Sequence, residues 1–131
     1  TTRSMNAEER AQIRARVCTL AEQLAAAYGA AVETDWYEGP PATCNDGFWA
    51  SYAEEKAKER GLNVVPAPKS LGGEDFAFYQ EKVPGMFVLV GTGLSAAIHN
   101  PTFRVDPRAL APTAHYLAEL VRGALGKVKE R

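Results

Sequence analysis

A lone histidine, a pair of adjacent carboxylates and an asparagine are the side chains of this sequence best suited to chemistry. His99 follows an apolar run broken by glycines and precedes Asn100-Pro101. Imidazole is the commonest transition-metal ligand and the usual acid or base near neutral pH. A single histidine can equally be a hydrogen-bonded structural residue. His99 is therefore a candidate metal ligand or acid–base group. The functional and the structural interpretations both stay open.

The carboxylates Glu74 and Asp75 directly follow the glycine pair Gly72-Gly73. They can act as metal ligands, as an acid–base pair or as substrate contacts. Alternatively, one of them caps a short helix that we expect to run to Gln80. The glycines either let a substrate approach the backbone closely or only permit a tight turn. Neither pair is assigned a single role by its spacing.

Asn45 lies in residues 38–47, which are rich in proline and glycine and form the best candidate for a hinge. Its amide can hydrogen-bond a substrate carboxylate or carbonyl, or it can cap the helix that follows. The remaining polar candidates are weaker: we expect no nucleophile among Cys44, Ser70 and Ser95, and we expect His115 on a helix surface.

Helices are predicted on both sides of these residues. Asn6 and Glu9 have the spacing of a capping box, and Gly29 suits the left-handed position after a helix. Between them an apolar stripe recurs every three or four residues, formed by Ile13, Val17, Leu20, Leu24 and Tyr28. Further helices are predicted over residues 47–60 and from Pro112 onward, the last with a core stripe of Leu117, Leu120, Val121 and Leu125.

Strands are predicted in three places. Residues 30–37 alternate between two faces, which indicates a strand with one exposed face, and residues 62–65 form a short strand. Residues 86–90 are an uninterrupted apolar run, which is typical of a central strand covered on both faces. The fold class predicted is therefore α/β.

Composition limits the classes of function. The chain has 131 residues, 46% of them hydrophobic, and a net charge of −1, so neither nucleic acid nor a membrane is expected as a partner. Cys18 and Cys44 are expected to be reduced thiols in a cytoplasmic protein. The opening Thr1-Thr2-Arg3 reads as the end of a strand, so we expect a piece of a longer protein.

Several motifs, in order, resemble the C-terminal part of the metal-dependent aminoacylase/carboxypeptidase amidohydrolases, which include hippurate hydrolases and N-acyl-amino-acid and indole-acetyl-amino-acid hydrolases. The main ones are residues 72–76 (Gly-Gly-Glu-Asp-Phe), 90–93 (Val-Gly-Thr-Gly) and 98–103 (Ile-His-Asn-Pro-Thr-Phe). Residues 2–3, the first helix and residues 41–46 resemble the second half of that family's lid, or dimerisation, domain and its return hinge. The likeness covers essentially the whole chain.

The resemblance implies a zinc-peptidase-like catalytic domain over residues 39–131, preceded by the second half of an α+β lid over residues 1–38. It implies hydrolysis of N-acyl-amino-acid amide bonds by a metal-activated water, at a site of two divalent metal ions (Zn, Mn, Ni or Co). His99 matches a metal-binding histidine, and Asn45, Gly72 and Gly73 match positions near the substrate pocket. A homodimer formed through the lid is also implied.

The remaining ligands of that family lie in its N-terminal half, and this sequence has no matching motif. A catalytic metal needs about three protein ligands, so we expect this chain alone to bind no metal and to be inactive. The alternative is a non-catalytic domain that binds a protein partner through the first helix and the edge of residues 30–37.

Overall fold

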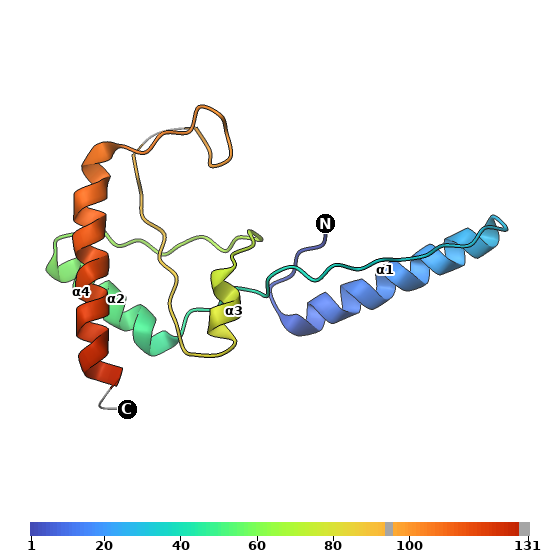
Figure 1. Ribbon diagram of the computed structural model, residues 1–131, viewed down its shortest axis with the longest axis horizontal. Coiled ribbons are helices and arrows are strands. Elements are labelled where there is room, and N and C mark those ends of the chain that lie inside the picture. Colours follow the sequence, from blue (N-terminus) through green and yellow to red (C-terminus); the bar gives the residue numbers. More distant parts are fainter. Residues whose placement is uncertain (94–95, 129–131) are drawn as a thin grey trace. The chain divides into compact units, whose positions relative to one another are not determined.

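The computed structural model describes residues 1–93 and 96–128 and is built from helices joined by irregular segments (Figure 1). In chain order the elements are α1 (Ala7–Ala27), α2 (Gly47–Glu59), α3 (Phe76–Gln80), the 3-10 helix η1 (Pro107–Ala109) and α4 (Leu110–Val128). No helix in these ranges is long and apolar enough to cross a membrane. Ser95 lies outside the described residues.

The chain forms two compact units. The first unit contains Thr1–Asn45 and Pro68–Phe87, and the second contains Asp46–Ala67 and Val88–Arg131. This division differs from the predicted boundary at residue 38. That boundary concerns the domains of a longer protein, and it stays a prediction.

In the first unit, local signals define the ends of α1. The Asn6 side chain accepts a hydrogen bond from the Glu9 backbone N–H at 2.8 Å, which confirms the predicted N-cap. The Glu9 carboxylate reaches back to the N–H of Met5 at 3.3 Å rather than to that of Asn6. After the helix, Gly29 takes the expected left-handed conformation with φ 66°. The predicted helix is therefore confirmed at both ends.

The predicted apolar stripe lies on α1 but is not buried in the described chain. No residue of α1 is buried, and Leu24 and Tyr28 are 63% and 82% exposed. Figure 1 shows the return segment, residues 30–40, running beside α1. One extended segment is too narrow to cover a helical face, so the stripe stays largely open to solvent.

The three predicted strands are also wrong for the residues that the structure describes, because residues 30–37, 62–65 and 86–90 form no strand. A strand exists only where a neighbouring strand accepts its backbone hydrogen bonds. Here the backbone of Phe87 pairs with the side chain of Asn45 instead, at 2.8 and 2.9 Å. The predicted α/β sheet is absent from these residues, although its segments have strand-like composition.

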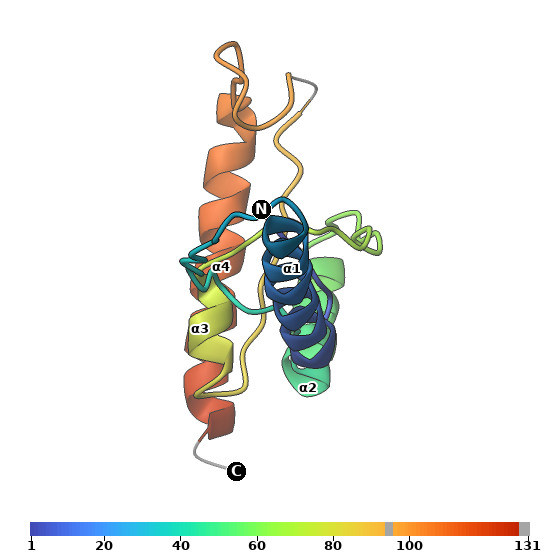
Figure 2. The same cartoon turned by 90° about the vertical axis from the view of Figure 1, so that its right-hand side faces the viewer.

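The second unit is organised by the packing of α2 against α4, and Figure 2 shows α4 along its length. The buried residues are Tyr52, Ala53 and Ala57 on α2, and Tyr116 and Leu120 on α4. The Tyr116 hydroxyl donates to the Ala53 carbonyl at 2.9 Å. A Cβ added at Gly123 would lie 1.9 Å from the Tyr52 hydroxyl oxygen, so only glycine lets the two helices approach this closely.

In the second unit, the start of α4 and the burial of its apolar stripe differ from the sequence prediction. The cap of α2 is supplied by Asp46 and not by Asn45, because the Asp46 side chain accepts from the Trp49 N–H at 3.0 Å. Helix α4 begins at Leu110, and Pro112 falls in its first turn, where a missing N–H costs no intrahelical hydrogen bond. Of the predicted core stripe of α4 only Leu120 is buried, whereas Leu117, Val121 and Leu125 are 45%, 61% and 64% exposed. The face of α4 that packs on α2 carries Tyr116, Leu120 and Gly123, so it overlaps the predicted stripe only at Leu120.

Candidate functional site

His99 sits in a tight turn of the second unit. Its φ is 69°, the one positive φ among the described residues other than glycine. The turn is closed by hydrogen bonds from Asn100 N–H to the Ala97 carbonyl at 3.1 Å and from Phe103 N–H to the Asn100 carbonyl at 2.9 Å. Such a conformation is uncommon for residues other than glycine and gathers at functional sites. The His99 side chain is exposed, and its ring has no hydrogen-bond partner within the described chain.

The carboxylates Glu74 and Asp75 precede α3 in the first unit. Asp75 occupies the N-cap position, but its side chain makes no capping hydrogen bond, so the predicted cap is wrong. The backbone explains this difference. Asn6 and Asp46 cap from extended conformations, whereas Asp75 is already helical, with φ −65° and ψ −21°. Both carboxylates are exposed and uncommitted by a cap.

Gly73 lies close to two other segments of the first unit. A Cβ built on it would meet a guanidinium nitrogen of Arg3 at 2.6 Å and the Pro40 ring at 3.4 Å. The Gly72 N–H donates to the Ser70 hydroxyl at 3.0 Å. Gly73 therefore allows a close approach between segments of this chain, which is neither of the two roles predicted for the pair, and the predicted approach of a substrate stays a prediction. Sequence reasoning gave Arg3 no place beside Gly73, since that contact joins residues far apart in the chain.

Asn45 joins the end of the predicted hinge to the segment after α3. Its Oδ1 accepts from the Phe87 N–H at 2.8 Å and its Nδ2 donates to the Phe87 carbonyl at 2.9 Å. The Gln80 amide donates to Asn45 Oδ1 and to the Gly85 carbonyl, and its oxygen accepts from the Cys44 N–H. Asn45 therefore acts as a brace, and one N–H of its amide has no partner in the described chain.

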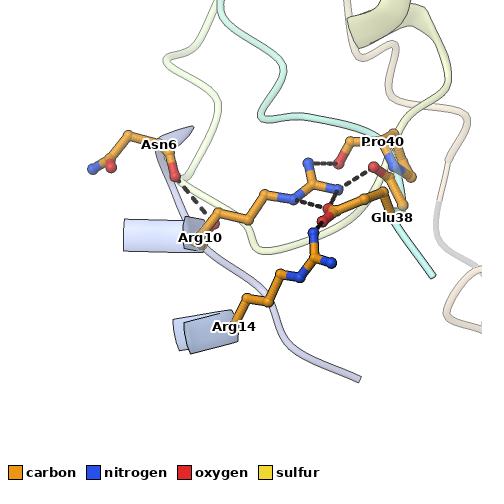
Figure 3. Close-up of polar contacts among 7 residues, drawn as sticks. Asn6, Arg10, Arg14, Glu38 and Pro40 are labelled. Carbon is orange, nitrogen blue, oxygen red and sulfur yellow. Dashed lines mark hydrogen bonds and ion pairs between the residues drawn. The ribbon is translucent and has the colours of Figure 1, made fainter. Parts of the chain in front are cut away.

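Arg10 and Glu38 hold the other end of the hinge to α1 (Figure 3). The Arg10 guanidinium contacts the Glu38 carboxylate at 3.0 and 3.1 Å, and Arg14 contacts the same carboxylate at 2.7 Å. Arg10 also donates to the Pro40 carbonyl at 3.0 Å and to the Gly39 carbonyl. Sequence reasoning missed this cluster, because an arginine on a helix surface is usually solvated.

The residues described here do not form a complete metal site. No group of three histidine, cysteine, aspartate or glutamate side chains comes together among them. A catalytic metal is held by about three protein ligands. His99 belongs to the second unit, whereas Asn45, the glycine pair and the two carboxylates belong to the first or border it. The described chain therefore offers at most one ligand in His99, and we derive no reaction step through a metal from it.

Comparison with known proteins places these residues in a family context. The model of peptidase family M20/M25/M40 matches residues 5–123. An N-acetylcysteine deacetylase of Bacillus subtilis is 40% identical over 98% of this chain and 34% of its own length. An N-acetyl-L-cysteine deacetylase of the same organism is 32% identical over 99% of this chain and 31% of its own. The chain thus spans about a third of the length of these curated relatives.

A solved structure agrees with these matches. The YXEP protein of Bacillus subtilis, described as a dinuclear metal-binding peptidase from the M20 family, is 41% identical to this chain. It superposes with a TM-score of 0.81 over 89% of this chain and 33% of its own length. The fold of this chain is therefore similar to about a third of a protein described as a dinuclear metal-binding peptidase.

Proposed function

Because the chain belongs to peptidase family M20/M25/M40, we propose that it is the C-terminal part of a metal-dependent amidohydrolase that cleaves N-acyl-amino-acid amide bonds. The observation that carries this proposal is the 40% identity to an N-acetylcysteine deacetylase across 98% of the chain. A second deacetylase and a dinuclear metal-binding peptidase match nearly the same residues. The substrate proposed is a small N-acyl amino acid.

His99 is the metal ligand that we propose from this chain. Both nitrogens of its ring are uncommitted within the described residues, as a ligand requires. Two divalent metal ions (Zn, Mn, Ni or Co) are proposed for the longer protein, in keeping with the dinuclear relative. Since the described residues form no cluster of three ligands, the other ligands are proposed to lie outside this chain, and the chain alone is proposed to be inactive.

The finer assignments follow from the same proposal. Asn45, Gly72 and Gly73 are proposed near the substrate, Asn45 through its one free amide N–H and the glycines through exposed backbone. Residues 1–38 are proposed as part of a lid and residues 39–131 as part of the catalytic domain. A homodimer through the lid and a cytoplasmic location complete the proposal.

The experiment uses the full-length protein. We expect it to bind two divalent ions per chain and to hydrolyse N-acetylcysteine or N-benzoylglycine. His99→Ala should remove one metal equivalent and lower kcat/KM by about 100-fold or more, since even groups that only hydrogen-bond a metal's ligands contribute about 10–100-fold. The matched control is His115→Ala, which changes the other histidine of the chain, an exposed residue of α4. A wild-type protein that neither binds metal nor hydrolyses these amides contradicts the proposal.

A second function is favoured by the open face of α1. Helix α1 has no buried residue, and Tyr37 on the neighbouring segment is 94% exposed. A non-catalytic domain that binds a protein partner through α1 and the edge of residues 30–37 would cover this face. The metal and hydrolysis measurements separate the two functions, because this one requires neither.

A further inference from the structure

The guanidinium of Arg10 binds three consecutive residues of the predicted hinge. It contacts the carboxylate of Glu38 and the carbonyls of Gly39 and Pro40, so all three of its nitrogens have a partner (Figure 3). Its side chain is 26% exposed, against 51% for that of Arg14. A planar guanidinium donates in fixed directions, and it therefore orients the backbone that accepts from it. Arg10 holds the shape of residues 38–40 through backbone carbonyls, whereas the described contacts of Arg14 are with two side chains, the Glu38 carboxylate and the Trp36 ring.

The far end of the hinge is fastened separately. The Cys44 N–H donates to the Gln80 side chain at 3.1 Å, and the Asn45 amide pairs with both backbone groups of Phe87. Between the two fastened ends lie only Pro41, Ala42 and Thr43. Proline fixes its own φ, so the backbone angles free to rotate in this stretch are the ψ of Pro41 and the φ and ψ of residues 42–43.

The hydroxyl of Thr43 contributes no hydrogen bond that would hold this stretch in place. It is buried and has no hydrogen-bond partner within the described chain. A buried hydroxyl without a partner costs stability. The arrangement of residues 41–43 is thus imposed by the two fastened ends and not by contacts of Thr43 itself.

We propose that Arg10 is a positioning residue that sets the angle at which the predicted lid joins the predicted catalytic part, by holding residues 38–40 against α1. The proposal rests on the proposed function for its effect on turnover, but the contact itself is independent of catalysis. The contact of Arg10 with residues 38–40 confines the rotation between the predicted lid and the predicted catalytic part to residues 41–43. Without Arg10, rotation can also occur at residues 38–40.

The test compares Arg10→Met with Arg16→Met in the full-length protein. Methionine keeps an unbranched side chain of good helix propensity in both variants. Arg16 lies on the same helix, is exposed and forms no hydrogen bond or ion pair with another side chain of the described residues, so its variant is the matched control. Native-state cleavage by chymotrypsin after Tyr37, located by mass spectrometry, reports opening of the held segment. We expect Arg10→Met to be cleaved there about tenfold faster or more, because the segment then opens without breaking hydrogen bonds to a charged group.

Cleavage after Tyr28 is the internal control, since Tyr28 is 82% exposed and makes no contact with Arg10. Its rate should not change in Arg10→Met. Equal acceleration at Tyr28 and Tyr37 would show general unfolding and would overturn the proposal. Equal rates after Tyr37 in Arg10→Met and Arg16→Met would also overturn it.

Arg10→Lys separates charge from geometry. A lysine keeps the positive charge and can pair with Glu38, but its single ammonium cannot hold the carbonyls of Gly39 and Pro40 at the same time. We expect Arg10→Lys to behave like Arg10→Met, and full recovery in Arg10→Lys would overturn the proposal. In an active enzyme, kcat should fall about tenfold in both variants with unchanged metal content. A wild-type protein without hydrolase activity contradicts the proposed function alone, because the cleavage rates still test Arg10.

Discussion

Each of the two units of this chain is stabilised internally by a different kind of contact. The second unit buries Tyr52, Ala53, Ala57, Tyr116 and Leu120 between two helices. In the first unit Ala77 is the one buried hydrophobic residue among those described. Its segments are joined instead by the side chains of Arg10, Asn45 and Gln80, which bind backbone groups of other segments.

This difference separates stability from position. Burial of apolar area is non-directional and supplies most of the free energy of folding. Exposed hydrogen bonds and ion pairs contribute little each, but they fix where one segment lies against another. We infer that the second unit is the more stable of the two, and that the polar contacts of the first unit serve mainly to orient the predicted hinge.

The largest effect is expected from Gly123→Ala in the second unit. The new methyl group would clash with the Tyr52 hydroxyl oxygen, so the buried Tyr52 ring or the two helices must shift. We expect the free energy of unfolding to fall by about 1–3 kcal/mol, as for other overpacked cores. Chemical denaturation measures this change.

Gly126→Ala is the matched control for that substitution. It lies on the same helix, and an added Cβ meets nothing within 4 Å. It should raise the free energy of unfolding by up to about 1 kcal/mol through helix propensity. Adding Tyr52→Phe should recover part of the loss in Gly123→Ala, since the nearest ring atom is 3.1 Å away. A stabilised Gly123→Ala protein would contradict the description of this packing.

A smaller effect is expected from Asn45→Ala in the first unit. The substitution removes two hydrogen bonds to the Phe87 backbone and should cost about 1–2 kcal/mol. The Phe87 amide, which donates to Asn45, should exchange with solvent faster, while the packing of α2 on α4 stays unchanged. Asn63→Ala, at an exposed position in the second unit, is the control. Unchanged exchange at Phe87 would show that Asn45 does not brace this segment.

Tyr116→Phe tests a buried hydrogen bond between α4 and α2 in the second unit. It removes the hydrogen bond to the Ala53 carbonyl and should cost about 1 kcal/mol, with Tyr79→Phe as an exposed control. Burial raises the pKa of Tyr116 above the ordinary value near 10. The contribution of the neutral Tyr116 side chain to the free energy of unfolding is therefore fully present below pH 10, and it is lost as the pH rises through the pKa of the folded state. A wild-type protein that loses no more stability than Tyr116→Phe above pH 10 would contradict this.

The smallest effect is expected at the start of η1. The Arg108 side chain, and secondarily its backbone N–H, hold the pKa of Asp106 below its usual range. A lowered pKa means that the ionised Asp106 carboxylate contributes to the free energy of unfolding above pH 4. This contribution is lost as the pH falls through the pKa of the folded state. Asp106→Asn keeps a capping oxygen but does not titrate. Between pH 5 and pH 2 it should show a slightly shallower loss of stability than wild type, and an identical pH profile would contradict the assignment.

The sequence alone predicted the elements whose causes are local. The ends of α1 follow from Asn6, Glu9 and Gly29, which act on backbone groups within a few residues. The short motifs around residues 72–76 and 98–103 were enough to identify the family, which the family match confirms. Such features depend on neighbours in the chain, and pattern reasoning captures them well.

Only the tertiary structure decided which faces are buried and which polar groups are paired. Asn45 was expected at a substrate or a helix cap, but its partner Phe87 lies 42 residues away. The helix face that Tyr116 and Leu120 bury became apparent only through contacts such as the hydrogen bond to Ala53, 63 residues away. The predicted strands failed for the same reason, because a strand requires a partner whose position no local pattern contains. Local hydrogen bonds depend on residues close together in the sequence, whereas burial and the pairing of distant groups depend on the folded chain.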